Sequence, residues 1–213
     1  MIKLRIAILL GLSILLGLTV FLYNTTGHAA FVAGTDYQAI SPPVGTTDPD
    51  KVVVTEVFWY GCPHCFRFEP YIRRWSSKLP AGVVFERQPS TLNPPWFVHA
   101  RAFYAFEMMG VLDQVHSDFF DAIHLERKRL FDLDSIAGWI ASRGLDEKAF
   151  RDDFASFAVD TEIQKNAMKE KRYGNRGVPA MIVNGKYLVS APYADSFEQM
   201  IEIVDFLVDK ELQ

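Results

Sequence analysis

The two cysteines of the chain, Cys62 and Cys65, stand two residues apart directly after an apolar run at residues 52–60. An apolar strand that leads into C-x-x-C at the start of a helix is the layout of a dithiol redox site. A Cys62 sulfur at the helix N-terminus would face unpaired backbone N–H groups and the positive end of the helix dipole. Pro63 suits the first helical turn, because its missing N–H costs nothing there. Cys65 would lie one turn on, so the motif predicts a small disulfide ring that opens and closes.

Other uses of C-x-x-C fit this chain less well. Half of a zinc site would need further ligands, and the chain has no second cysteine pair. A c-type haem needs His directly after the second cysteine, where Phe66 stands. A purely structural disulfide of this spacing would restrain the unfolded chain little. His99, His116 and His124 lack metal-ligand spacing with the cysteines and are interpreted as helix-face residues, so we expect no metal and no cofactor beyond the cysteine pair itself.

Length and composition limit the remaining classes of function. At 213 residues the chain can form one good core, or one domain that carries an inserted one. A hydrophobic fraction of 49% and a charged fraction of 23% are ordinary for a globular protein. The formal net charge of −4 provides no basic footprint for nucleic acid, so we expect no nucleic-acid partner.

The N-terminal sequence predicts export. Lys3 and Arg5 precede an uncharged apolar run at residues 6–23, and a small-x-small cleavage pattern follows it. We interpret residues 1–30 as a secretory signal peptide. The run is also close to the length that spans a bilayer, so an uncleaved inner-membrane anchor formed by residues 6–23 is the alternative. Either way the rest of the chain would enter an oxidising compartment, where disulfides persist.

Apolar periodicity, caps and turn residues place the remaining elements. Strands are expected at residues 37–40, 52–60, 83–88, 180–183 and 186–189. Helices are expected at residues 62–78, 97–109, 111–125, 134–143, 146–157, 159–173 and 196–212. Asn184-Gly185 predicts a type I′ hairpin turn. This is too much helix for a minimal strand–helix–strand unit, so we expect an α/β domain at 31–94 and 161–213 with an inserted all-helical domain at 95–160.

The segments Phe58–Cys65 and Gly177–Ala180 together resemble the DsbA family of periplasmic thiol:disulfide oxidoreductases. The resemblance covers residues 31–213. It implies a thioredoxin fold, with a central mixed sheet flanked by helices and an inserted helical domain. It also implies that Val178-Pro179 is the cis-proline loop facing the two sulfurs, where the backbone of Val178 pairs with an extended substrate.

Further positions match this family. Glu56 matches a buried acid beneath the active site, and Glu69 falls where the family often has an acid on the first helix. The segment Val183–Tyr187 matches the terminal hairpin. The long apolar N-terminal run departs from the family pattern, and so does the absence of the second, structural disulfide that some members carry.

The resemblance and the motif together predict an exported dithiol oxidase. The helix N-terminus, His64 and nearby backbone N–H groups should lower the pKa of Cys62, while Cys65 keeps an ordinary or raised pKa. A substrate thiolate would attack Cys62 and form a mixed disulfide, which a second substrate cysteine then resolves. Glu56 is the candidate proton carrier for Cys65. The resemblance implies reoxidation by a quinone-linked membrane partner of the DsbB type, and we expect unfolded or reduced exported proteins as substrates of a monomer.

Two other classes of function stay open at this point. One is a disulfide isomerase or reductase on the same fold. The other is a non-catalytic module, either a peptide-binding chaperone or a copper-binding protein that uses the cysteines and His64. Four aromatic side chains are expected mainly in the core, with one or two forming an apolar rim for unfolded substrate: Trp59, Tyr60, Phe66 and Phe68.

Overall fold

The computed structural model describes residues 31–213. The expected signal peptide or anchor, residues 1–30 with the apolar run at 6–23, lies outside the described residues. Between residues 31 and 213, no helix is both long enough and apolar enough to cross a membrane.

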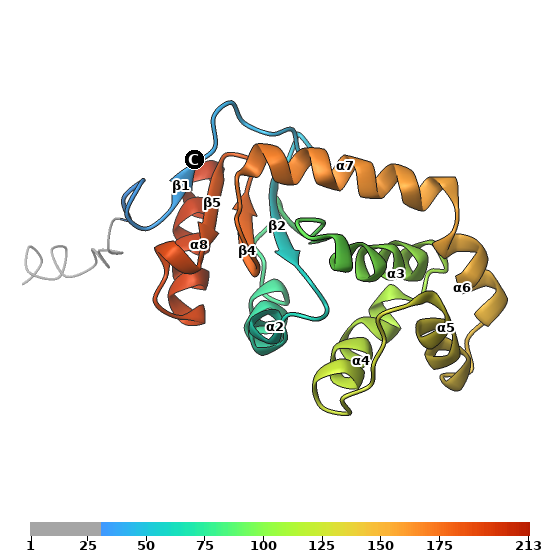
Figure 1. The fold of residues 1–213 in the computed structure, drawn as a ribbon. Helices are drawn as coiled ribbons and strands as arrows, with labels where there is room; N and C mark the ends of the chain where they lie inside the picture. Colours follow the sequence, from blue (N-terminus) through green and yellow to red (C-terminus); the bar gives the residue numbers. More distant parts are fainter. Residues whose placement is uncertain (1–30) are drawn as a thin grey trace, which may run out of the picture. The chain divides into compact units, whose positions relative to one another are not determined.

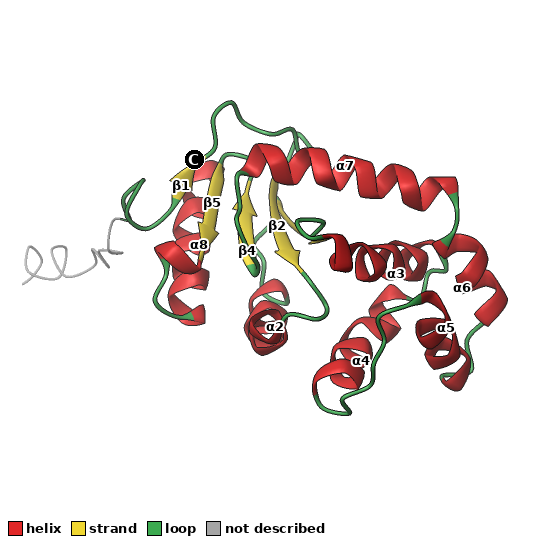
Figure 2. Ribbon diagram, viewed as in Figure 1, coloured by secondary structure: helices red, strands yellow, loops and turns green. Residues whose placement is uncertain are grey.

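A mixed sheet forms one half of this part of the chain (Figures 1 and 2). Its strands are β1 (Gln38–Ala39), β2 (Val52–Phe58), β3 (Val83–Pro89), β4 (Ala180–Val183) and β5 (Tyr187–Ser190), in the order β1-β5-β4-β2-β3. β2 pairs in parallel with β3, and the other neighbours are antiparallel. All seven residues of β2 are buried, because the strand lies inside the sheet and is covered on both faces.

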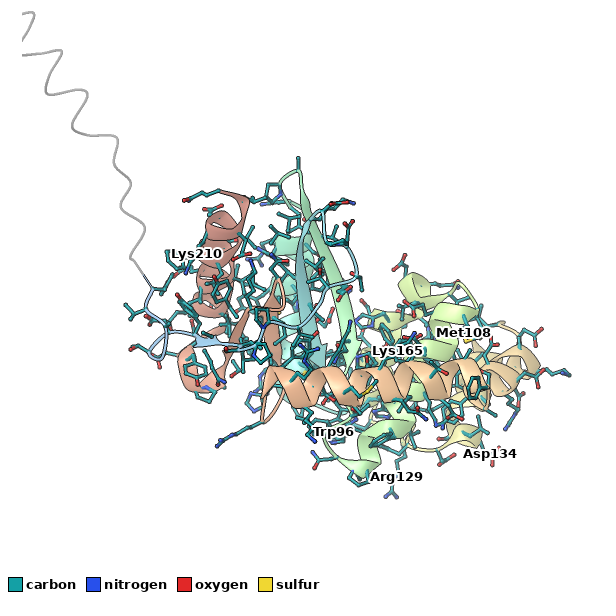
Figure 3. The ribbon with its side chains drawn as sticks, turned by 90° about the horizontal axis from the view of Figure 1, so that it is seen from above. Trp96, Met108, Arg129, Asp134, Lys165 and Lys210 are labelled. Atoms are coloured by element: carbon teal, nitrogen blue, oxygen red, sulfur yellow. The ribbon has the colours of Figure 1, made fainter. Side chains whose placement is uncertain are left out.

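The helices divide into those that cover the sheet and those that form a separate group (Figure 1). They are α2 (Pro63–Ser76), α3 (Phe97–Met108), α4 (Leu112–His124), α5 (Leu133–Ser142), α6 (Glu147–Phe154), α7 (Phe157–Tyr173) and α8 (Phe197–Leu212), with short 3-10 helices η1 (Pro94–Trp96) and η2 (Ala191–Tyr193). α2 and α8 pack on the sheet, whereas α3 to α6 lie together beside it. Seen from above, α7 runs from this helical group back to the sheet, with Lys165 along its length (Figure 3).

The thioredoxin fold with an inserted helical domain is confirmed, but the start of α5, the end of α6 and the start of α7 were predicted wrongly. α5 begins after Asp132, whose side chain and Ser135 form a reciprocal capping box, and not at Asp134. The predicted helix at 146–157 ends early, because Ser156 accepts a hydrogen bond from the Val159 N–H and starts α7. The proposed domain boundary at residue 160 falls inside α7, so the division at 95–160 stays a proposal.

The turn between β4 and β5 is the predicted type I′ turn. Asn184 and Gly185 have φ values of 50° and 63°, both in the left-handed region that this turn requires. A Cβ atom at Gly185 would lie 1.9 Å from the carbonyl oxygen of Val44, so only glycine fits there. The hairpin holds β4 in register beside β2.

Two apolar clusters meet at the end of β2. One lies between the sheet, α2 and α8 and includes Val54, Phe68 and Ile203. The other fills the helical group and extends to Phe58, Tyr60 and both cysteines. The chain that leaves β2 therefore enters the junction between the sheet and the helical group, and this junction holds the candidate site.

Candidate active site

Cys62 occupies the helix N-terminus that the sequence predicts. It is the N-cap residue of α2, with Pro63 in the first turn. The backbone N–H of Cys65 donates to the Cys62 sulfur at 3.2 Å. Both cysteines are free thiols, Cys62 6% exposed and Cys65 fully buried. One sulfur therefore lies nearer to solvent than the other.

The two thiols differ in acidity as well as in exposure. A hydrogen bond from the Cys65 thiol lowers the pKa of Cys62 to about 7, against the opposing effect of burial. The backbone N–H groups of Cys65 and His64 and the charge of Arg67 act in the same direction. Burial raises the pKa of the Cys65 thiol well above its usual value. At neutral pH the pair can therefore hold a thiolate on Cys62 and a proton on Cys65.

His64 lowers the pKa of Cys62 through its backbone and not through its imidazole. Its imidazole is exposed, and its Nδ1 lies 3.0 Å from the Arg67 guanidinium. Its share in lowering the pKa of Cys62 comes from its backbone N–H group. Arg67 was not singled out from the sequence, although its place three residues after His64 puts both on one helix face.

Val178 and Pro179 lie beside the cysteines, as the resemblance implies. The peptide bond between them is cis. The Val178 carbonyl oxygen accepts a hydrogen bond from the Cys62 thiol, with 3.6 Å between oxygen and sulfur. A groove of about 530 Å³ adjoins this contact. Its lining includes His64, Val178, Pro179, Ala194, Phe197 and Met200. An extended peptide that reached Cys62 would meet both this backbone and this apolar groove.

Glu56 is completely buried in β2, as the family position implies. Arg87 of β3 approaches it, with Nε 3.3 Å from Oε2, but neither Glu56 oxygen has a hydrogen bond. Burial, together with the nearby Glu69 carboxylate, raises the pKa of Glu56 to about 8. Glu56 can therefore hold a proton at neutral pH. When it is ionised, its negative charge adds to the effect of burial in raising the pKa of Cys65.

Glu69 is the second acid at the site and differs from Glu56 in its partners. Arg87 Nη2 donates to it at 3.2 Å, and His116 Nε2 lies 3.2 Å from its other oxygen. Burial acts against ionisation, but the hydrogen bond from His116 and the charge of Arg87 lower the pKa of Glu69 overall. The two carboxyl groups around one guanidinium are thus driven to opposite protonation states.

His116 was interpreted only as a helix-face residue, and sequence reasoning missed its contacts. It lies on α4 but is 6% exposed, and its Nδ1 is 2.8 Å from the Tyr60 hydroxyl. His99 is also buried, with Nε2 2.7 Å from the Leu130 carbonyl oxygen. Nothing in the local sequence pairs residue 116 with residues 60 and 69, because these contacts join distant elements.

The aromatic residues around the motif divide as expected. Tyr60 and Phe68 are fully buried, whereas Trp59 and Phe66 are partly exposed. Trp59 stacks on Trp96, with ring centroids 4.7 Å apart. The residues from 31 to 213 contain no group of three His, Cys, Asp or Glu side chains placed to hold a metal ion.

Comparisons with known proteins agree with this geometry. A family model described as "DSBA-like thioredoxin domain" matches residues 71–202. The chain is 41% identical to the thiol:disulfide interchange protein DsbA of Pseudomonas aeruginosa over 85% of this chain and 86% of that one. It is 36% identical to DsbA of Azotobacter vinelandii over 87% and 93% of the two chains. Crystal structures of DsbA from P. aeruginosa and Xylella fastidiosa superpose with TM-scores of 0.81 and 0.80, at 41% and 28% identity, covering 85% of this chain and 95% and 98% of theirs.

Proposed function

This chain belongs to the DsbA family, a family of thiol:disulfide oxidoreductases, and from that premise we propose that it is an exported dithiol oxidase. Its oxidised form would donate the Cys62–Cys65 disulfide to proteins that are folding. The observation that carries the proposal is the inequality of the two sulfurs. Cys62 sits at a helix N-terminus with a pKa of about 7, and Cys65 is buried with a raised pKa.

The direction of transfer follows from the acidity of Cys62. Only the reduced form has a thiolate, so a lowered pKa stabilises the reduced form over the disulfide. This stabilisation is complete above the pKa of an unfolded cysteine and is lost as pH falls through about 7. A stabilised dithiol makes the disulfide a stronger oxidant.

The exchange proceeds in two displacements. A substrate thiolate attacks the Cys62 sulfur, forms a mixed disulfide and releases Cys65 as a thiolate. Glu56 gives its proton to Cys65, and the Glu56 carboxylate then recovers a proton from water. A second substrate thiolate attacks the substrate sulfur of the mixed disulfide, which leaves a disulfide in the substrate and a thiolate on Cys62.

The backbone at Val178 and the groove beside it would hold the substrate. The Val178 carbonyl already accepts a hydrogen bond from Cys62, so a peptide strand laid along this residue would bring its own sulfur close to the reactive one. Backbone pairing makes few demands on sequence. This suits an enzyme that serves many unfolded chains.

The remaining parts of the cycle rest on family membership and on the N-terminal sequence. We place the reaction in the periplasm, because an apolar run after Lys3 and Arg5 directs export. A quinone-linked membrane oxidase of the DsbB type would restore the disulfide. The cysteine pair itself carries the electrons, so the protein would need no other cofactor, and it would act as a monomer.

The redox equilibrium with glutathione, read by trapping free thiols, tests the direction of the reaction. We expect a potential well above that of thioredoxin. A potential near that of thioredoxin would instead favour an isomerase or reductase.

A pair of single variants tests the mechanism. Cys65→Ser should accumulate a mixed disulfide between Cys62 and a reduced peptide, and Cys62→Ser should not. The double variant separates the remaining class, since a peptide-binding chaperone would keep its activity without either sulfur.

A further inference from the structure

A chain of polar contacts runs behind the cysteines through two strands, two helices and the loop after β2. The Tyr60 hydroxyl lies 2.8 Å from His116 Nδ1, and His116 Nε2 lies 3.2 Å from Glu69 Oε1. Arg87 Nη2 lies 3.2 Å from Glu69 Oε2, and Arg87 Nε lies 3.3 Å from Glu56 Oε2. Each group comes from a different segment: Tyr60 from the loop after β2, His116 from α4, Glu69 from α2, Arg87 from β3 and Glu56 from β2. Tyr60 stands at the end of this chain opposite Glu56, and His116 links Tyr60 to Glu69.

The contacts fix which imidazole nitrogen carries hydrogen. A carboxylate only accepts hydrogen bonds, so the His116 nitrogen that faces Glu69, Nε2, must be the donor. Burial lowers the pKa of His116, so the ring is neutral and Nδ1 is bare. Nδ1 then accepts from the Tyr60 hydroxyl, which burial keeps protonated by raising the pKa of Tyr60. The orientation of the ring and the identity of its donor nitrogen are therefore set by its two partners.

The charges around Arg87 do not balance without a proton. Two carboxyl groups, Glu56 and Glu69, share one guanidinium, and the side chains of these acids are 0% and 9% exposed while that of Arg87 is 24% exposed. One of the two must be neutral for the site to avoid an excess buried charge. Glu69 accepts hydrogen bonds from two donors, whereas neither oxygen of Glu56 accepts a hydrogen bond. The difference between the two acids is made by Arg87 Nη2 and by His116.

We propose that His116 is a positioning residue that assigns the shared proton to Glu56, because its Nε2–H bond keeps Glu69 ionised. The inference rests on the proposed function, in which Glu56 gives this proton to the Cys65 thiolate. Without the imidazole donor, Glu69 would compete for the proton, and the charge of Arg87, whose Nε already lies 3.3 Å from Glu56 Oε2, would act mainly on Glu56. Glu56 would then ionise at lower pH and would more often lack the proton that the released Cys65 sulfur needs.

Several other titratable groups face this network and must be considered in any titration. Arg87, Glu69 and Cys62 act on Glu56, and Cys62 and Glu56 act on Cys65. Asp113, one turn before His116 on α4, acts on His116 together with Glu69 and Arg87. Among these groups Arg87 is the permanent cation, and it is retained in every variant below.

The test is a titration of the Glu56 side-chain carboxyl by carbon NMR in the purified full chain, with the resonance assigned by its loss in Glu56→Gln. We expect a midpoint near pH 8 in the unsubstituted protein. His116→Leu should lower that midpoint by about one pH unit or more. His116→Gln, which keeps an N–H donor, should restore most of it.

A kinetic measurement follows the same proton. The contribution of Glu56 to the rate at which a small thiol reduces the disulfide should disappear as Glu56 loses its proton. In His116→Leu this should happen at a lower pH than in the unsubstituted protein. A merely structural role would change the rate at every pH and leave the midpoint in place. An unmoved midpoint in His116→Leu, or an equal shift in the Leu and Gln variants, would overturn the proposal.

A second variant protects the test against a folding failure of His116→Leu. Glu69→Gln makes the competing acid neutral without touching the imidazole, so the proposal requires the Glu56 midpoint to fall in this variant too. A midpoint that stays near pH 8 there would also overturn the proposal. The carboxyl titration uses no substrate, so its result is independent of the glutathione equilibrium that tests the oxidase activity itself.

Discussion

Replacing Glu56 with Gln should stabilise this protein, and the gain should depend on pH. Glu56 is 0% exposed, and neither carboxylate oxygen has a hydrogen bond. Gln has nearly the same shape but cannot ionise. The variant therefore removes the cost of a buried acid while leaving the packing of β2 almost unchanged.

The size of the gain follows from the pKa of about 8, compared with 4.5 for an ordinary Glu. A raised folded-state pKa destabilises the fold only where the unfolded chain would be ionised, that is, above pH 4.5. The cost then grows by about 1.36 kcal/mol per pH unit until pH 8, where it levels off. At pH 7, two and a half units above the ordinary value, it amounts to about 3 kcal/mol.

Urea unfolding between pH 4.5 and pH 8 measures this dependence. Both proteins should carry Cys62→Ser and Cys65→Ser so that no thiol titrates in the same range. The difference in unfolding free energy should be near zero at pH 4.5 and should rise to about 3 kcal/mol in favour of Gln at pH 7. Glu69→Gln is the matched control. The pKa of Glu69 is lowered, so its stabilisation is present above its unfolded pKa, and its loss should destabilise the protein at pH 7.

A constant difference across this range would refute the reasoning. It would mean that Glu56 titrates at its ordinary pH in the folded protein, and that burial and Glu69 do not govern it. A gain in stability for both Gln variants would refute the assignment of opposite protonation states to the two acids.

Three further outcomes are expected. The reduced protein should melt at a higher temperature than the oxidised protein above pH 7, and calorimetry should show the difference shrinking as pH falls through 7, because the Cys62 thiolate is then lost. Glu170→Ala should cost about 3 kcal/mol or more in urea unfolding, because the buried carboxylate accepts hydrogen bonds from Ser90 and Thr91 that nothing would replace. Gly185→Ala should cost about 2 kcal/mol or more by the same assay, since its φ is 63° and the added methyl would strike Val44; equal stability would contradict the turn geometry.

Local patterns accounted for most of the elements. The apolar run at 52–60 identified the central strand, and Asn184-Gly185 identified the hairpin, because each depends on a few consecutive residues. Helix ends were harder to predict. The pattern predicts a start at Asp134 for α5, but Asp132 forms the cap, and Ser156 begins a new helix within the helix predicted to run to residue 157. Several nearby residues could have capped each helix, and only packing selected among them.

The sequence by itself determined the redox pair. Cys62 and Cys65 are neighbours on one helical turn, so their spacing alone brings the sulfurs together and puts one of them at the helix N-terminus. The lowered pKa of Cys62 follows largely from that same turn, since the groups that lower it come from Cys65, His64 and Arg67. The raised pKa of Cys65 comes mainly from burial, which the tertiary structure supplies.

The proton site was decided only by the tertiary structure. Glu56, Glu69, Arg87 and His116 come from β2, α2, β3 and α4, and no pattern along the chain shows that one guanidinium must serve two carboxyl groups. The contact of Val178 with Cys62 spans 116 residues in the same way. A pKa depends on distances and burial in three dimensions, so these groups acquired their roles only when the sheet and the helical group packed together.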